Sequence, residues 1–192
     1  MIRGLVIVMF LPLFCFGQTK GKGKAGFHSI IGGGAMIGET KTKAFFQYSG
    51  GLQFDRYFTG IGIGYDAYKL NTIPVFADWR MNFGPRRVLF VYANVGASLA
   101  ANVQKEEKTD YSRGFTRPGL YTDGGFGYRL PLGNSHRLTL SVGHSFKRIT
   151  DVHEFTYPCG LVPCNQPTAT TTNAYRYNYN RIVVKTGWEF GK

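Results

Sequence analysis

The feature that most constrains this chain is a two-residue alternation of apolar and polar side chains. It is clearest from residue 73 to residue 83, where Ile73, Val75, Ala77, Trp79, Met81 and Phe83 share one parity. The other parity holds Pro74, Phe76, Asp78, Arg80 and Asn82. Successive side chains of a β-strand point to opposite faces, so this pattern predicts a strand with one apolar and one polar face.

The same alternation recurs along the chain after a glycine-rich opening segment. With that opener, eight strands are predicted. They cover residues 26–38, 44–54, 57–68, 73–83, 89–99, 120–130, 136–146 and 175–190. An even number of short, regularly spaced strands is typical of a closed antiparallel barrel.

The connections between these segments alternate in length. Tight turns are expected at 55–56, 84–87 and 133–135. Between them lie 39–43 and 69–71, and then two long loops at 102–116 and 150–174. Outer-membrane barrels have short periplasmic turns and longer outer loops. The sequence therefore predicts an all-β fold, an eight-stranded antiparallel up-and-down transmembrane β-barrel with both ends on the tight-turn side.

Composition supports this class and excludes others. Only 18% of the 192 residues are charged, 16% are aromatic, and 26 are glycine. This excludes a disordered chain and a coiled coil, and the lack of a G-X-Y period excludes collagen. The net charge of +12 is dispersed over turns and loops, so nucleic acid is not an expected partner. These cations are expected to be solvated; the alternative is that cations in the loops meet anionic lipid headgroups or lipopolysaccharide phosphates.

The first residues differ in kind from the rest. Residues 1–17 contain one charge, Arg3, followed by an apolar run that ends at Phe16 before the small Gly17. This pattern predicts a cleaved secretory signal peptide, because the run is too short for a retained membrane helix. The predicted organisation is a signal peptide at 1–17, a short periplasmic tail at 18–25 and an outer-membrane barrel at 26–192.

The two faces of the predicted strands separate a membrane barrel from a soluble one. The polar face is dominated by Gly, Ser, Asn and Tyr, with scattered charges of both signs that suit a crowded polar lumen. The predicted lumen charges are Asp66, Asp78, Arg80, Asp123, Arg129, Arg181, Lys185 and Glu189. The tyrosines expected to help fill the lumen are Tyr92, Tyr121, Tyr177 and Tyr179. The apolar face carries aromatic residues next to the tight turns, as in the girdles of membrane barrels. The predicted girdle consists of Phe54, Tyr57, Phe83, Tyr128, Trp188 and Phe190.

A family resemblance rests on four segments: FGQ at 16–18, GIGIGYDAY at 60–68, IPVFADWRMNF at 73–83 and RIVVKTGWEF at 181–190. With these segments the chain resembles the small outer-membrane β-barrel proteins of Gram-negative bacteria, especially the porin-like barrel domain of Bacteroidota. The resemblance implies a location in the outer membrane and insertion by the barrel-assembly machinery. That machinery reads a terminal strand with alternating aromatics ending in Phe, and this chain adds Gly191 and Lys192 after Phe190.

Candidate chemical sites are few. Cys159 and Cys164 lie close together in the longest predicted loop and are expected to form a disulfide. No metal and no cofactor are expected, because His153 and Glu154 lack the tight paired spacing of a zinc site with these cysteines. His144 and Ser145 supply residue types for acyl chemistry, but alternation sends them to opposite faces. The chain is therefore not expected to be an enzyme.

The expected function is that of an integral outer-membrane barrel with a plugged polar lumen, serving as a structural or surface-binding element. Its expected partners are outer-membrane lipids including lipopolysaccharide, and an extracellular ligand held by the long loops. The alternatives are a small-solute porin, a lipid-modifying barrel enzyme and a secreted soluble lipocalin-like ligand binder.

Overall fold

The structure is a computed structural model that describes residues 25–38, 41–101, 112–133, 135–158 and 168–191. Among these residues there is no helix long and apolar enough to cross a membrane. Residues 1–17, with the predicted signal peptide, and most of the predicted tail lie outside the described residues.

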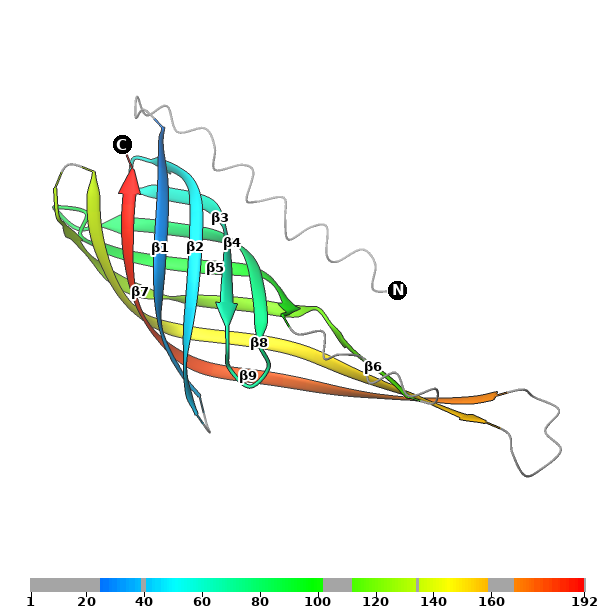
Figure 1. Cartoon of the computed structure of the whole chain (residues 1–192). Coiled ribbons are helices and arrows are strands. Elements are labelled where there is room, and N and C mark those ends of the chain that lie inside the picture. The colour runs from blue at the N-terminus through cyan, green and yellow to red at the C-terminus, as the bar shows by residue number, and fades with distance from the viewer. Residues whose placement is uncertain (1–24, 39–40, 102–111, 134, 159–167, 192) are drawn as a thin grey trace, which may run out of the picture.

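The described residues form one antiparallel sheet that closes on itself. Its strands in chain order are β1 (Gly26–Ile37), β2 (Thr42–Phe54), β3 (Tyr57–Asp66), β4 (Thr72–Phe83), β5 (Leu89–Ala100), β6 (Ser112–Arg117), β7 (Gly119–Pro131), β8 (His136–Pro158) and β9 (Thr168–Gly191). Strands β1 to β5 each pair with the next strand along the chain, β5 pairs with β7, β7 with β8 and β8 with β9. Strand β9 returns to pair with β1 from Gly191 opposite His28 to Ile182 opposite Ile37. This last pairing closes the barrel (Figure 1).

Strands β6 and β7 together form one strand of the wall. Both pair with β8, β6 through Arg117 opposite Thr150 and β7 from Tyr121 opposite Lys147. Between these two pairings the chain advances by four residues, from 117 to 121, whereas β8 advances by only three, from 147 to 150. The ladder therefore contains a bulge at Pro118, which has no backbone N–H to donate. The wall is therefore an eight-stranded antiparallel β-barrel, which confirms the predicted fold class.

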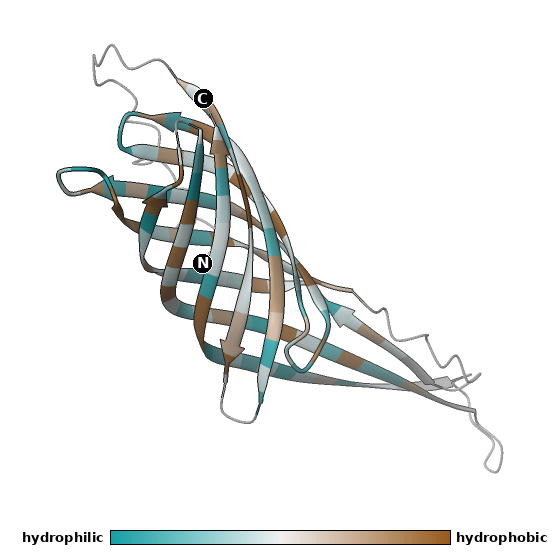
Figure 2. Cartoon of the chain, turned by 60° about the vertical axis from the view of Figure 1, so that its left-hand side comes forward, coloured by the Kyte–Doolittle hydropathy of each residue, from teal (hydrophilic) through white to brown (hydrophobic). Residues whose placement is uncertain are grey.

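The alternation seen in the sequence separates the interior from the exterior. In β9, Arg181, Val183, Lys185, Gly187 and Glu189 are buried, whereas the residues that alternate with them are exposed. Figure 2 shows the result as alternating hydrophilic and hydrophobic bands along the strands. The exterior carries many large apolar side chains, and Ile61 leaves 77% of its surface uncovered. The barrel is thus apolar outside and polar inside.

The two ends of the barrel differ. The start of β1, the end of β9 and the three tight turns lie at one end, here called the turn end. At the other end β8 and β9 continue as a paired ribbon as far as Pro158 opposite Thr168, with β6 alongside (Figure 1). We call residues 148–158, 168–178 and β6 the ribbon.

The ribbon corrects the predicted loops. The prediction of a loop over 150–174 was wrong in extent, because β8 runs to Pro158 and β9 begins at Thr168 rather than at residue 175. The predicted loop at 102–116 likewise ends in β6. The backbone ladder continues here although neither face is apolar, because paired strands need only each other to satisfy their N–H and C=O groups.

Candidate functional site

The barrel interior holds a column of charged groups arranged around four carboxylates. Near the ribbon end, Asp66 accepts from Arg181 at 2.5 Å and pairs with Lys147 Nζ at 2.9 Å. Arg181 also reaches the Ser145 hydroxyl at 2.9 Å, and Lys147 donates to the carbonyls of Tyr68 and Leu70. Asp66, Lys147 and Arg181 are almost completely buried. Three strands and the β3–β4 turn are thereby tied together from inside.

The middle of the column contains two acid–base pairs. Arg80 binds Asp78 through two nitrogens, at 3.0 and 2.8 Å, and the Ser49 hydroxyl donates to the same carboxylate at 2.7 Å. The second pair joins Lys185 to Asp123, which also accepts from the hydroxyls of Tyr92 and Tyr121. Each carboxylate therefore has a cation and at least one neutral donor, as buried charges require.

At the turn end, Glu189 collects three cationic or polar partners. Its carboxylate contacts His28 Nδ1 at 3.1 Å, Arg129 at 2.9 Å and Arg137 at 3.0 Å. These residues come from β1, β7, β8 and β9, so Glu189 sits where the first and last strands of the wall meet. The contact with His28 reinforces the closure between β1 and β9.

Aromatic rings fill the space between the charged clusters. The Arg80 guanidinium lies 5.8 Å from the ring centres of both Phe58 and Phe90, and Lys185 Nζ lies 4.3 Å from the ring centre of Tyr92. Such cation–π contacts stabilise cations that have left water. The cavity at this level measures about 10 Å³, enough for about one water molecule.

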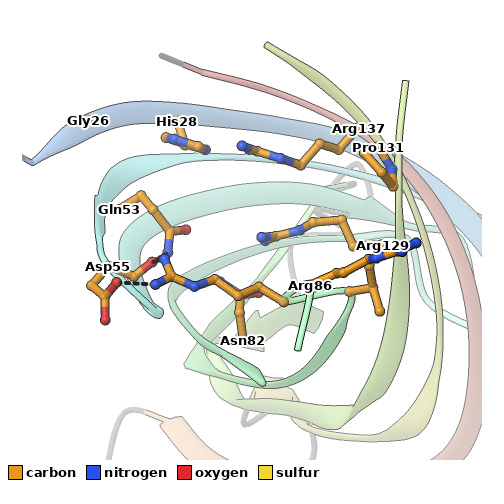
Figure 3. A pocket seen from close by; sticks show the side chains of 11 residues that line it. Gly26, His28, Gln53, Asp55, Asn82, Arg86, Arg129, Pro131 and Arg137 are labelled. Atoms are coloured by element: carbon orange, nitrogen blue, oxygen red, sulfur yellow. Dashed lines mark hydrogen bonds and ion pairs between the residues drawn. The ribbon is translucent and has the colours of Figure 1, made fainter. Parts of the chain in front are cut away.

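A larger cavity opens at the turn end. Its volume is about 420 Å³, and Figure 3 shows side chains from several strands and turns around it. Its charged or polar lining residues are His28, Gln53, Asp55, Asn82, Arg86, Arg87, Arg129 and Arg137. We call this cavity the turn-end mouth.

The predicted lumen charges all lie inside the wall. Asp66, Asp78, Arg80, Asp123, Arg129, Arg181, Lys185 and Glu189 are buried and take part in the clusters above. The predicted girdle residues lie on the exterior next to the turn end; Phe54, Tyr57, Tyr128 and Trp188 are exposed, and Phe83 and Phe190 are half-buried.

The remaining predicted candidates are not brought together. His144 is exposed on the outer surface, whereas Ser145 is buried inside against Arg181. His153 and Glu154 lie on the ribbon, and no group of three or more potential metal ligands occurs within the described ranges. Cys159 and Cys164, with their expected disulfide, fall outside the described residues.

Sequence reasoning missed three members of the interior column and misplaced one residue. Lys147 was missed because its strand was predicted to end at Phe146, and His28 because it lies in the glycine-rich opener. Arg137 lies in the strand predicted at 136–146, but nothing in the sequence indicates its contact with Glu189. Tyr177, expected to fill the lumen, is 41% exposed on the ribbon and stacks on Tyr179 instead. This prediction was wrong because Tyr177 lies in the ribbon, beyond the closed part of the barrel.

Comparisons with known proteins identify the fold. No family model and no curated protein sequence matches the chain. The solid-state NMR structure of the outer membrane protein AlkL in DMPC lipid bilayers is similar, with a TM-score of 0.50 and 11% identity over 91% of this chain and 93% of that one. The solution NMR structure of the de novo designed TMB2.3 aligns with a TM-score of 0.41 and 12% identity, over 90% of this chain and 97% of that one.

Proposed function

We propose that this protein is an integral outer-membrane barrel that presents a β-ribbon at the cell surface and does not conduct solutes. The observation that carries the proposal is the reversal of ordinary soluble-protein polarity: ion pairs fill the inside and large apolar side chains cover the outside. Apolar side chains on the exterior can pack against the lipid hydrocarbon. Because the barrel is closed, the backbone N–H and C=O groups of the wall hydrogen-bond to one another. The similarity to an outer membrane protein studied in lipid bilayers supports the same location.

The tryptophans allow a direct test of this location. Trp79 and Trp188 both face outward, so after refolding into vesicles their fluorescence should be strongly quenched by lipids brominated on the acyl chains and little affected by iodide. Trp79→Phe and Trp188→Phe report on each position separately. A protein that stays soluble without detergent and shows no quenching would be a secreted lipocalin-like barrel instead.

A closed lumen distinguishes this proposal from a small-solute porin. The middle of the barrel contains Arg80 between Phe58 and Phe90, and its cavity is about 10 Å³. We therefore expect the protein in planar bilayers to show no stable conductance steps. Discrete, reproducible channels in 1 M KCl from wild-type protein would favour the porin reading.

The ribbon supports a surface-binding role. Its described side chains include an aromatic group, in which His153 lies 6.5 Å from Phe155 and 6.1 Å from Tyr175 between ring centres. Exposed cations surround the ribbon end and are suited to lipopolysaccharide phosphates; they are Lys41, Lys43, Lys69, Arg117, Arg148 and Arg176. Replacing residues 151–174 by a short turn should remove most of the ribbon and leave the tryptophan quenching unchanged. This variant therefore separates membrane insertion from surface binding.

We propose no catalytic role for His144 and Ser145. The strand that carries His144 and Ser145 directs the two side chains to opposite sides of the wall. Proton transfer between them would require hydrogen-bond contact.

A further inference from the structure

The turn-end mouth has more positive charge than its own carboxylates offset. Four guanidinium groups line it, from Arg86, Arg87, Arg129 and Arg137, and among the described residues only Asp55 and Glu189 pair with them. The Arg87–Asp55 pair closes at 2.6 Å, and Glu189 is shared by Arg129 and Arg137. Two positive charges therefore remain before His28 is considered.

The turn between β4 and β5 positions the least engaged of these cations. Gly84 adopts φ +87°, and the Arg87 N–H donates to its carbonyl at 3.2 Å. Pro85 occupies the second position of this turn, where its fixed φ is favourable. Arg87 then turns toward Asp55, while Arg86 lines the mouth and forms no ion pair with any described residue.

The deeper wall of the mouth offers a donor that is already desolvated. Arg129 is only 7% exposed, and its buried Nε has no hydrogen-bond partner in the described part of the protein. A buried donor without a partner costs free energy, which a ligand acceptor would recover. Unpaired oxygens of Gln53 and Asn82 lie at the same cavity and can accept from a hydroxyl or a protonated phosphate oxygen.

We propose that the turn-end mouth binds a phosphate group. The guanidinium fork matches the planar pair of oxygens that phosphate presents, and a volume of about 420 Å³ exceeds what inorganic phosphate needs, so the phosphate of a larger solute also fits. The site lies at the end opposite to the ribbon, and it is independent of surface binding. The same chemistry can come from a free phosphate or from the headgroup of an anionic lipid.

Calorimetric titration of detergent-refolded protein with inorganic phosphate tests the site. Saturable binding is expected, and Arg86→Gln should weaken it about tenfold, the worth of one charge-assisted hydrogen bond. Arg86 lies in an exposed turn, so this variant should still fold. On a denaturing gel its unheated and boiled samples should differ in mobility as those of the wild type do. Arg56→Gln, the same change at an exposed arginine in the β2–β3 turn that does not line the mouth, is the matched control and should bind as wild type does.

A second titration separates the two sources. Mixed micelles containing phosphatidylglycerol should compete with inorganic phosphate if a lipid headgroup reaches the mouth, and should not compete if the site takes soluble phosphates alone. The proposal is overturned if neither ligand binds saturably, or if Arg86→Gln binds phosphate as tightly as Arg56→Gln.

Discussion

Replacing Asp66 by asparagine is expected to destabilise the barrel by about 3–5 kcal/mol, because it leaves two buried cations without their shared carboxylate. Arg181 and Lys147 both pair with Asp66, and the side chains of all three are no more than 1% exposed. An amide of the same shape keeps the packing but removes the charge. The free energy of unfolding in urea, measured for protein refolded in detergent micelles, gives the difference.

Asp55→Asn is the matched control for this prediction. Asp55 also pairs with an arginine, Arg87, but both side chains are about half exposed at the turn end, where such a pair contributes at most about 1 kcal/mol. Adding Lys147→Met to Asp66→Asn should cost less than Lys147→Met alone, since the lysine has then lost its carboxylate. Equal losses for Asp66→Asn and Asp55→Asn would show that the interior column is not desolvated.

The strands of the wall were predictable because each has an apolar outer face and a polar inner face, which produces a two-residue period in the sequence. From Ile73 to Phe83 every outward position is apolar, and the structure confirms both the strand and its orientation. The same logic failed for the ribbon. Beyond Phe146 neither parity is consistently apolar, so periodicity could not reveal that β8 continues to Pro158. The usable signal there was the richness of Thr and Tyr, which favour strands without an apolar face.

The interior was predictable by parity but not by partner. Alternation identifies Asp66 as facing the opposite side from Tyr65, yet nothing local indicates that its cations come from residues 147 and 181. Pairing across a closed barrel depends on the register of several strands at once. The turn-end mouth depends on this register as well, because its lining residues come from two turns and five strands. Parity therefore predicts which side a residue faces, and only the fold determines which residue it meets.

The second large effect is expected at Gly62, where the narrow barrel leaves no space for a side chain. A Cβ at this inward position would lie 2.4 Å from the ring of Phe76 and 2.9 Å from the carbonyl oxygen of Tyr48. Phe76 cannot move aside freely, because its ring also contacts Tyr121 at a centre distance of 5.7 Å. Gly62→Val should therefore destabilise the barrel by about 3 kcal/mol through overpacking, measured by urea unfolding in micelles.

Gly50→Val separates this steric effect from a general cost of changing a strand glycine. Gly50 faces outward on the adjacent strand β2, and the nearest atoms to a Cβ there are the hydroxyl oxygen of Tyr48 at 3.3 Å and a ring carbon of Phe27 at 3.5 Å. These exterior rings can shift into the surrounding micelle or lipid, and valine favours the strand conformation more than glycine does. Gly50→Val should thus change the free energy of unfolding by less than about 1 kcal/mol. If the two variants lose stability equally, the interior around Phe76 is looser than these distances imply, and the proposal of a closed lumen that does not conduct would have to be abandoned.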